Sequence, residues 1–208
     1  MPFNPFDLHL VFSVHLKKSL PQVLVFLLLK PFALPTQYPF FFKQASTPWR
    51  NDPITIFGKT YPQPRMTSLH GHTTDPYGYS GIVMQPNPMN DTLLEIEKKL
   101  KAFSEEPFTT VLLNLYRDGK DSNGWHADDE PELGKNPVIA SVSLGAERYF
   151  HLKHKTDKSQ RLKFALGHGS LLLMEGSTQH FWKHQIAKTA REVGSRINLT
   201  FRKVLTAR

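Results

Sequence analysis

The second half of the chain is divided into short apolar runs, and no other feature limits its possible folds so strongly. These runs are rich in Val, Leu, Ile, Phe and Tyr and are separated by Gly, Asp, Asn and Ser. Many short strands marked off by turn residues are typical of antiparallel sandwiches and jelly rolls. We therefore expect a mainly β fold with flanking helices (α+β), of the jelly-roll type. The expected strands lie at residues 109–116, 138–144, 148–155, 162–166, 170–174 and 196–204.

Two further elements are expected before these strands. Residues 54–57 read Ile-Thr-Ile-Phe and predict a short strand that ends in a turn at Gly58 and Lys59. Residues 93–103 predict an amphipathic helix. Its apolar positions are Leu94, Ile96, Leu100 and Phe103.

The first 47 residues show neither the spacing of a helix nor the alternation of a strand, and prolines interrupt them. Their apolar run from Val23 to Leu29 is far shorter than the roughly 20 residues that a membrane-spanning helix needs. We expect buried structure there, with the apolar core of a signal peptide as the alternative. The sequence thus divides into a poorly assigned segment, 1–47, and a folded domain, 48–208.

Amino-acid composition limits which binding partners and which kinds of metal or catalytic site are possible. The 26 Lys and Arg outnumber the 18 Asp and Glu, which gives a formal charge of +8 and favours polyanions such as nucleic acid. The absence of cysteine excludes disulfides, thiolate metal sites and a cysteine nucleophile. Histidine and carboxylate side chains remain as strong metal ligands, and an intracellular setting is consistent with this composition.

One candidate metal site begins at His126. In an extended segment, His126 and Asp128 point to the same side and can reach one ion. The alternative is a solvated turn, in which Asp129 and Glu130 extend an acidic loop. A third ligand could come from His180 or His184, since the spacing of these residues places both on one face of a strand.

The last expected strand carries polar side chains at every second position. Its polar residues are Arg196, Asn198, Thr200 and Arg202, and the residues between them are apolar. The polar face is either solvated or a binding face for a dicarboxylate, which two guanidinium groups can pair with. Asn114 and Tyr116 have the same two-residue spacing on another strand and could form the opposite wall of a pocket.

Six short motifs follow one another over roughly residues 49–204. They are Asn114-Leu115-Tyr116, His126-Ala127-Asp128-Asp129-Glu130, 139–145 (IASVSLG), 168–171 (HGSL), Trp182-Lys183-His184 and 196–202 (RINLTFR). In order and spacing these motifs together resemble the AlkB family. The resemblance implies a double-stranded β-helix that uses Fe(II), 2-oxoglutarate and O₂ to hydroxylate a methyl group on an alkylated base. Formaldehyde, succinate and CO₂ would be released, and N1-methyladenine and N3-methylcytosine are the expected lesions.

Matched position by position, the resemblance implies a role for each site residue. His126, Asp128 and His184 match the family's iron ligands, which selects His184 over His180. Glu130 matches an acidic residue near the base pocket. The 2-oxoglutarate site is matched by Asn114, Tyr116, Arg196, Asn198, Thr200 and Arg202.

Two segments are expected to contact nucleic acid. The first is a basic hairpin at 148–163 that includes Lys153 and Lys155 and turns at 157–160; the alternative is an ordinary solvated hairpin. The second resembles the family's lid and offers Arg65 and Tyr79. It departs from the family at residues 68–71 (SLHG), where relatives carry aromatic residues before the glycine, so stacking on the base could differ.

The leading hypothesis is a demethylase of alkylated DNA, and RNA demethylation is the closest alternative because nothing in the sequence reads the sugar. A nucleic-acid-binding module that has lost turnover is a second hypothesis, and a protein-modifying oxygenase is a third. We expect a monomer that binds nucleic acid and no membrane, in the cytoplasm of a bacterial cell or the nucleus of a eukaryotic one.

Overall fold

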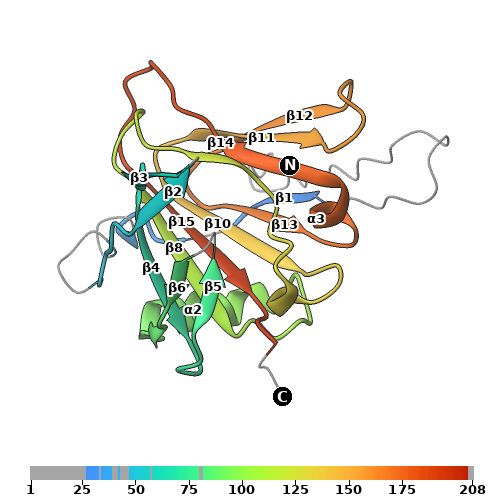
Figure 1. The fold of residues 1–208 in the computed structure, drawn as a ribbon. Helices are drawn as coiled ribbons and strands as arrows, with labels where there is room; N and C mark the ends of the chain where they lie inside the picture. The colour runs from blue at the N-terminus through green and yellow to red at the C-terminus, as the bar shows by residue number, and fades with distance from the viewer. Residues whose placement is uncertain are drawn as a thin grey trace, which may run out of the picture.

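Two β-sheets face each other in the computed structural model, which describes residues 27–32, 34–38, 42, 47–56, 58–79 and 82–205 (Figure 1). All strand pairs in these sheets are antiparallel except β4 with β7. The larger sheet has the order β1 (Leu27–Pro31), β13 (Ser170–Met174), β10 (Ile139–Gly145), β15 (Arg196–Arg202), β8 (Thr110–Tyr116), β4 (Met66–Gly71) and β7 (Asn87–Pro88). The smaller has the order β12 (Arg161–Leu166), β11 (Arg148–His154), β14 (Trp182–Ile186) and β9 (Asn123–His126).

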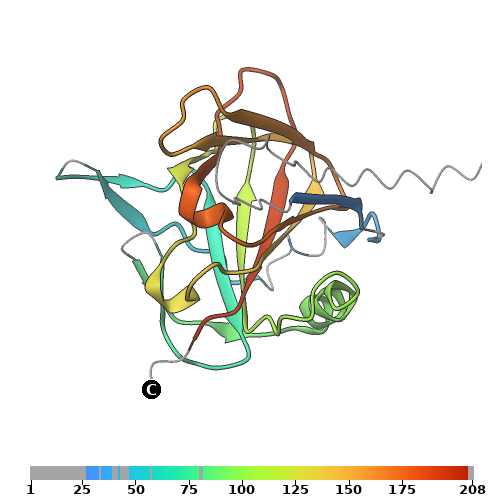
Figure 2. The same ribbon diagram turned by 90° about the vertical axis from the view of Figure 1, so that its right-hand side faces the viewer.

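The remaining elements flank this pair of sheets. They are the hairpin of β2 (Pro53–Ile56) and β3 (Lys59–Pro62), the hairpin of β5 (Tyr77–Tyr79) and β6 (Ile82–Met84), the helices α2 (Asp91–Leu100) and α3 (Thr178–Phe181), and the 3-10 helix η1 (Pro131–Leu133). The β2–β3 hairpin projects from the body of the molecule (Figure 2). The expected mainly β jelly-roll architecture with flanking helices is confirmed.

The predicted strands are all present, and their ends lie within two residues of the expected ones. The last strand, for example, ends at Arg202 rather than at residue 204. The early strand spans Pro53–Ile56, and residue 57 lies outside the described residues. The elements that the sequence did not predict include β4, β9, η1 and α3.

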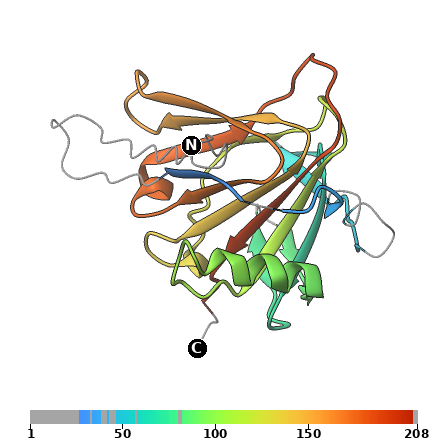
Figure 3. The same cartoon turned by 180° about the vertical axis from the view of Figure 1, so that it is seen from behind.

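Apolar side chains form two core layers, one on each side of the larger sheet. One layer fills the space between the two sheets and includes Leu112, Phe150 and Leu172. The other lies between the larger sheet and α2, which crosses the back of that sheet (Figure 3). Because side chains alternate along a strand, β15 places Leu199 in the second layer and its polar neighbours between the sheets.

Helix α2 begins two residues earlier than expected. Asn90 is its N-cap, and the Asn90 side chain accepts a hydrogen bond of 2.9 Å from the backbone N–H of Leu93. The buried face consists of Leu93, Ile96 and Leu100, whereas Leu94 is 41% exposed. The expected apolar face was therefore wrong at Leu94, because Leu93, three residues before Ile96 and seven before Leu100, shares their face of the helix.

Part of the N-terminal segment belongs to the same body. Strand β1 pairs with β13, and Phe32, Tyr38 and Phe42 are buried in the layer beside α2. Of the apolar run, Leu27 to Leu29 lie in β1, and residues 23–26 lie outside the described residues. The boundary at residue 47 stays a prediction. In the part of the chain that is described, no helix combines the length and the apolar character that crossing a bilayer requires.

Candidate active site

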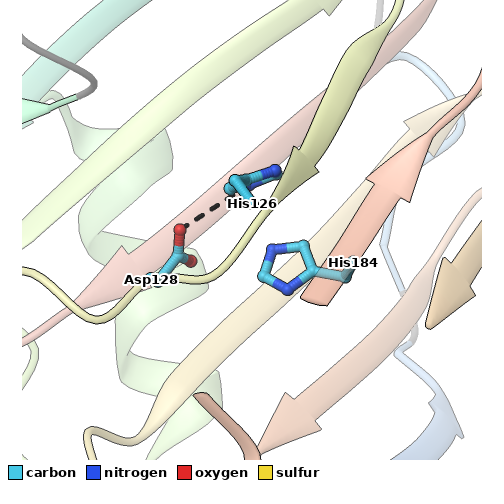
Figure 4. Close-up of side chains that lie close together, drawn as sticks. All are labelled: His126, Asp128 and His184. Atoms are coloured by element: carbon cyan, nitrogen blue, oxygen red, sulfur yellow. Dashed lines mark ion pairs between the residues drawn. The ribbon is translucent and has the colours of Figure 1, made fainter. Parts of the chain in front are cut away.

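Three possible metal ligands converge where β9 and β14 pair. His126 ends β9 and lies opposite His184 of β14, while Asp128 follows two residues after His126. One ligand atom from each residue lies within 4.8 Å of the others (Figure 4). The cross-strand pair brings the two imidazoles together, and the irregular segment after β9 adds the carboxylate. Two imidazoles and one carboxylate form the facial ligand set of non-heme Fe(II) oxygenases.

His126 and Asp128 each have an atom with a lone pair that is suited to bind a metal ion. Nδ1 of His126 lies 2.7 Å from the carbonyl oxygen of Gly124. A carbonyl can only accept, so Nδ1 carries the proton in the neutral ring and Nε2 keeps its lone pair. This nitrogen lies 3.7 Å from Oδ1 of Asp128. Oδ1 is buried and has no hydrogen-bond partner among the described residues, as expected of an oxygen reserved for a cation.

The electrostatics of the triad also suit metal binding. Burial lowers the pKa of both histidines, and with the help of neighbouring His126 that of His184 falls to about 3. Burial acts to raise the pKa of Asp128, but Arg202 and the two histidines outweigh it and hold this pKa well below its usual range. Near neutral pH the triad therefore presents two neutral nitrogen donors and one carboxylate.

Two neighbours fix Asp128 in place. Nη2 of Arg202 donates to Oδ2 at 2.9 Å, and both side chains are almost completely buried. The backbone N–H of Asp128 donates to Oε1 of Gln179 at 3.0 Å. Gln179 lies in α3, which the sequence does not predict, because a single turn of helix is too short to show a helical period.

The expectation that His180 shares a strand face with His184 was wrong. His180 lies in α3, ahead of β14, and its side chain is exposed. The helical turn breaks the two-residue alternation, so only His184 reaches Asp128 and His126.

A pocket between the sheets adjoins the triad. Strands β8, β10 and β15 supply most of its polar wall, and the paired registers place Asn114 opposite Asn198 and Tyr116 opposite Arg196. The two walls expected from the sequence thus lie side by side in one sheet. The lining residues are Asn114, Tyr116, Asn123, His126, Asp128, Ser141, Phe150, Met174, His184, Gln185, Ile186, Arg196, Asn198, Thr200 and Arg202.

Arg196 places unused hydrogen-bond donors in this pocket. Its Nη2 donates to Oγ of Ser143 at 2.9 Å, but its buried Nε and Nη1 have no hydrogen-bond partner among the described residues. Burial lowers the pKa of Arg196 to about 10, so the group is still a cation near neutral pH. Its Cζ lies 5.4 Å from the centre of the Tyr116 ring. A buried cation with open donors requires an anion, so this end of the pocket suits a carboxylate.

The side chains of Asn198 and Thr200 form hydrogen bonds within the larger sheet. Nδ2 of Asn198 donates to Oγ of Ser141 at 2.8 Å and to the carbonyl of Val142 at 3.1 Å. Oδ1 of Asn198 accepts from the Thr200 hydroxyl at 3.0 Å. All residues of β15 are buried, which excludes the alternative of a solvated polar face.

A family model described as 2OG-Fe(II) oxygenase superfamily matches residues 37–202. The chain belongs to this superfamily. The chain is 42% identical over 166 residues to alpha-ketoglutarate-dependent dioxygenase alkB homolog 3 of Bos taurus, covering 76% of this chain and 57% of that protein. To DNA oxidative demethylase ALKBH2 of Bos taurus it is 38% identical over 159 residues, covering 73% and 57%. Within the superfamily the chain is an AlkB homologue.

This AlkB homologue therefore spans little more than half the length of these two curated relatives. A solved structure described as "The structure of OsALKBH1" superposes with a TM-score of 0.51 at 19% identity, covering 76% of this chain and 82% of that one. The similarity to that structure supports the fold alone.

In this protein, the residues that the sequence places in the lid and the base pocket do not share one environment. Arg65 is buried rather than presented at the surface, and its Nε donates to Oδ1 of Asn114 at 2.9 Å. Tyr79 ends β5, but its side chain lies outside what the structure describes. Glu130 is half-buried close to the triad. Burial, reinforced by Asp128, raises its pKa to about 7.

Residues 68–71, where the sequence departs from the family, divide between the two faces of β4. Ser68 and His70 pair with Leu113 and Val111, so both face the layer beside α2. The buried His70 contacts Oγ of Ser68 at 3.1 Å and the carbonyl of Pro88 at 2.8 Å. Of the three residues before Gly71, only Leu69 faces the space between the sheets. It is therefore the one difference from the family pattern on the side of the pocket.

The basic hairpin forms β11 and β12 and turns at the expected residues, where the backbone N–H of Gln160 donates to the carbonyl of Asp157. Nζ of Lys153 lies 4.3 Å above the ring of Trp125. Nζ of Lys155 instead lies 2.9 Å from Oδ2 of Asp129. Lys153 thus faces outward on the smaller sheet, while Lys155 ties the hairpin to the loop that carries Asp128.

Proposed function

We propose that this protein removes methyl groups oxidatively from alkylated bases of DNA, with N1-methyladenine and N3-methylcytosine as substrates. The observation that carries the proposal is the position of the triad beside the open donors of Arg196. This arrangement combines a ligand set for Fe(II) with a cationic site for a dicarboxylate. The names of the relatives, a dioxygenase and a DNA oxidative demethylase, support the same activity.

The chain's own residues would perform the binding and orientation. His126, Asp128 and His184 would hold Fe(II) through two imidazole nitrogens and one carboxylate oxygen. When bound together with 2-oxoglutarate and O₂, the iron supplies the chemistry that hydroxylates the methyl group, and formaldehyde, succinate and CO₂ are released. Buried surroundings exclude bulk water from the reacting groups and strengthen their electrostatic interactions.

For 2-oxoglutarate we assign the polar wall of the pocket. Arg196 and Tyr116 would bind one carboxylate, since a guanidinium with free donors and a phenol beside it match an anion. Arg202 would lie near the other end, where it also holds Asp128. Asn114 lines the same wall, and Asn198 and Thr200 would support it through their bonds within the sheet.

Nucleic acid would lie on the outer face of the smaller sheet and present its base to the triad. On that face Lys153 pairs across β11 with Lys183 of β14 and Arg161 of β12. Nζ of Lys163 lies 3.7 Å above the ring of Tyr149. Like charges opposite one another destabilise a sheet, so this basic face (Lys153, Arg161, Lys163 and Lys183) favours a polyanion.

The base pocket would be formed near Glu130, with Tyr79 as the lid residue that the sequence places beside the base. A base in a duplex would have to leave the stack to reach the triad, and a lesion that disrupts pairing lowers the cost. An enzyme of this kind would work where nucleic acid is held, in the bacterial cytoplasm or the eukaryotic nucleus.

Mass spectrometry of methylated oligonucleotides tests the proposal. Single-stranded DNA and RNA carrying N1-methyladenine or N3-methylcytosine are incubated with protein, Fe(II), 2-oxoglutarate and ascorbate. Loss of the methyl group with equimolar succinate is expected for DNA, and His126→Ala serves as the matched control without the metal site. Faster loss from RNA would reverse the preference. Binding of the oligonucleotides without any loss of methyl would indicate a binding module instead.

A further inference from the structure

We infer that Arg65 is a positioning residue for the bound 2-oxoglutarate, acting through the side-chain amide of Asn114, and not a contact to the nucleotide. The inference deepens the proposed function, because it rests on 2-oxoglutarate occupying the pocket beside Asn114. It replaces the role in substrate binding that the sequence suggests for Arg65.

The position of Arg65 in the fold excludes a surface role. Its side chain is 4% exposed although it immediately precedes β4. The backbone around it is fixed from two sides. Nδ2 of Asn51 donates to the carbonyls of Gln63 and Arg65 at 2.9 and 2.8 Å, and the N–H of Ser122 donates to the carbonyl of Pro64 at 2.8 Å. A group fixed in this way holds its partner in one orientation.

The chemistry of the contact determines how Asn114 is oriented. A guanidinium has only donors, so the atom of Asn114 that faces Nε of Arg65 must be its oxygen. The two amide hydrogens on Nδ2 therefore point away from Arg65, on a residue that lines the pocket. Without Arg65 the amide could turn over and present its oxygen to an anion, which would repel it.

Charge supports the same assignment. Among the described residues, the guanidinium of Arg65 makes no ion pair with a carboxylate, whereas Arg202 is paired with Asp128. Arg65 and Arg196 thus leave the pocket region with two buried cations that have no acidic partner within the described chain. A dicarboxylate would balance them.

Calorimetric titration of the Mn(II)-loaded protein with 2-oxoglutarate tests the inference without turnover. Arg65→Met, which keeps the length of the side chain but removes charge and donors, should raise the Kd about ten- to hundredfold. Its Mn(II) affinity should be unchanged. Arg65→Lys should recover part of the loss. Arg50→Ala is the matched control, because Arg50 pairs with Asp52 at the surface and its loss should not change the Kd.

A double-mutant cycle shows whether Arg65 acts through Asn114. In an Asn114→Ala background, Arg65→Met should cost no more than about twofold in 2-oxoglutarate affinity. Asn114→Asp should keep a partner for Arg65 but lose affinity strongly, since an oxygen replaces the donor. If Arg65→Met does not fold, Arg65→Lys takes its place in the cycle, where its loss should likewise disappear once Asn114 is alanine.

Additive losses in the cycle, or a loss of oligonucleotide affinity with 2-oxoglutarate affinity intact, would overturn the inference. The inference would also be overturned if Arg65→Met lost Mn(II) affinity and thermal stability together with 2-oxoglutarate affinity, because a purely structural role would produce that result. Wild-type protein that binds Mn(II) but no 2-oxoglutarate would overturn the cosubstrate site itself, whereas normal binding by Arg65→Met would overturn only the role of Arg65.

Discussion

The carboxylate of Asp128 is shared between Arg202 and the two histidines: Oδ2 accepts from Nη2 of Arg202 at 2.9 Å, while Oδ1 faces the imidazoles and has no hydrogen-bond partner among the described residues. One metal ligand is therefore also half of a buried ion pair. Removing either partner of such a pair leaves an uncompensated charge in the core. The metal site and the stability of the fold are coupled through this carboxylate.

Asp128→Ala and His126→Ala should differ in stability although both lose the metal site. Asp128→Ala leaves Arg202 buried without its carboxylate and should lower the free energy of unfolding by about 3–5 kcal/mol. His126→Ala removes a neutral, half-buried ring and should cost about 1 kcal/mol. Urea unfolding of the metal-free proteins measures both values, and Mn(II) titration measures the loss of metal binding. Equal stability of the two variants would show that the ion pair contributes nothing.

Substitutions of Arg196 and of Arg202 should affect the binding of 2-oxoglutarate and of metal in different ways. Arg196→Met should raise the KM for 2-oxoglutarate by about a hundredfold, since a charge-assisted partner is worth several kcal/mol, and leave metal affinity unchanged. Arg202→Met should weaken both, because Arg202 also orients the metal ligand Asp128. Steady-state kinetics and Mn(II) titration distinguish the two patterns. Weaker Mn(II) binding by Arg196→Met would contradict this separation.

Lys153 should contribute to nucleic-acid affinity through a phosphate contact. Lys153→Ala is expected to weaken binding of DNA irrespective of sequence and to reduce the slope of log K against log salt by about 1. Lys98→Ala is the control, because Lys98 lies on α2 behind the larger sheet (Figure 3). Fluorescence anisotropy at several salt concentrations gives the slopes. The same slope for wild type and Lys153→Ala would place the polyanion elsewhere.

Asp121 should make stability depend on pH below neutrality. Burial opposes its charge, but its bonds with Arg117 at 2.7 and 2.8 Å outweigh this and lower the pKa of Asp121. A carboxyl whose pKa is lowered by folding stabilises above its unfolded pKa, and the effect disappears as the pH falls through the folded pKa. Asp121→Asn should therefore be less stable by about 1 kcal/mol at pH 7. Urea unfolding should show the difference shrinking below about pH 4, the unfolded pKa of Asp; a constant difference would argue against the ion pair.

The sequence determined the strands and the candidate residues because both are recorded in local patterns. Alternation of polar and apolar residues in 196–202 predicts a strand with one polar face, whatever lies beside it. An assumed strand alternation at 180–184 likewise made both His180 and His184 candidates for the third metal ligand. Only the resemblance to a family selected His184. Local spacing could not reveal α3, because one turn of helix leaves no period.

Tertiary structure decided which of these residues meet. The pairing of β9 with β14 places His126 opposite His184, although the two lie far apart in the chain. The contacts of Asp128 with Arg202 and Gln179, and of Arg65 with Asn114, likewise join residues far apart in sequence. Such contacts depend on strand register and burial, which no short stretch of sequence records. The sequence by itself therefore determined which chemical groups are available, and long-range packing decided which are shared, which are satisfied and which are left open for a ligand.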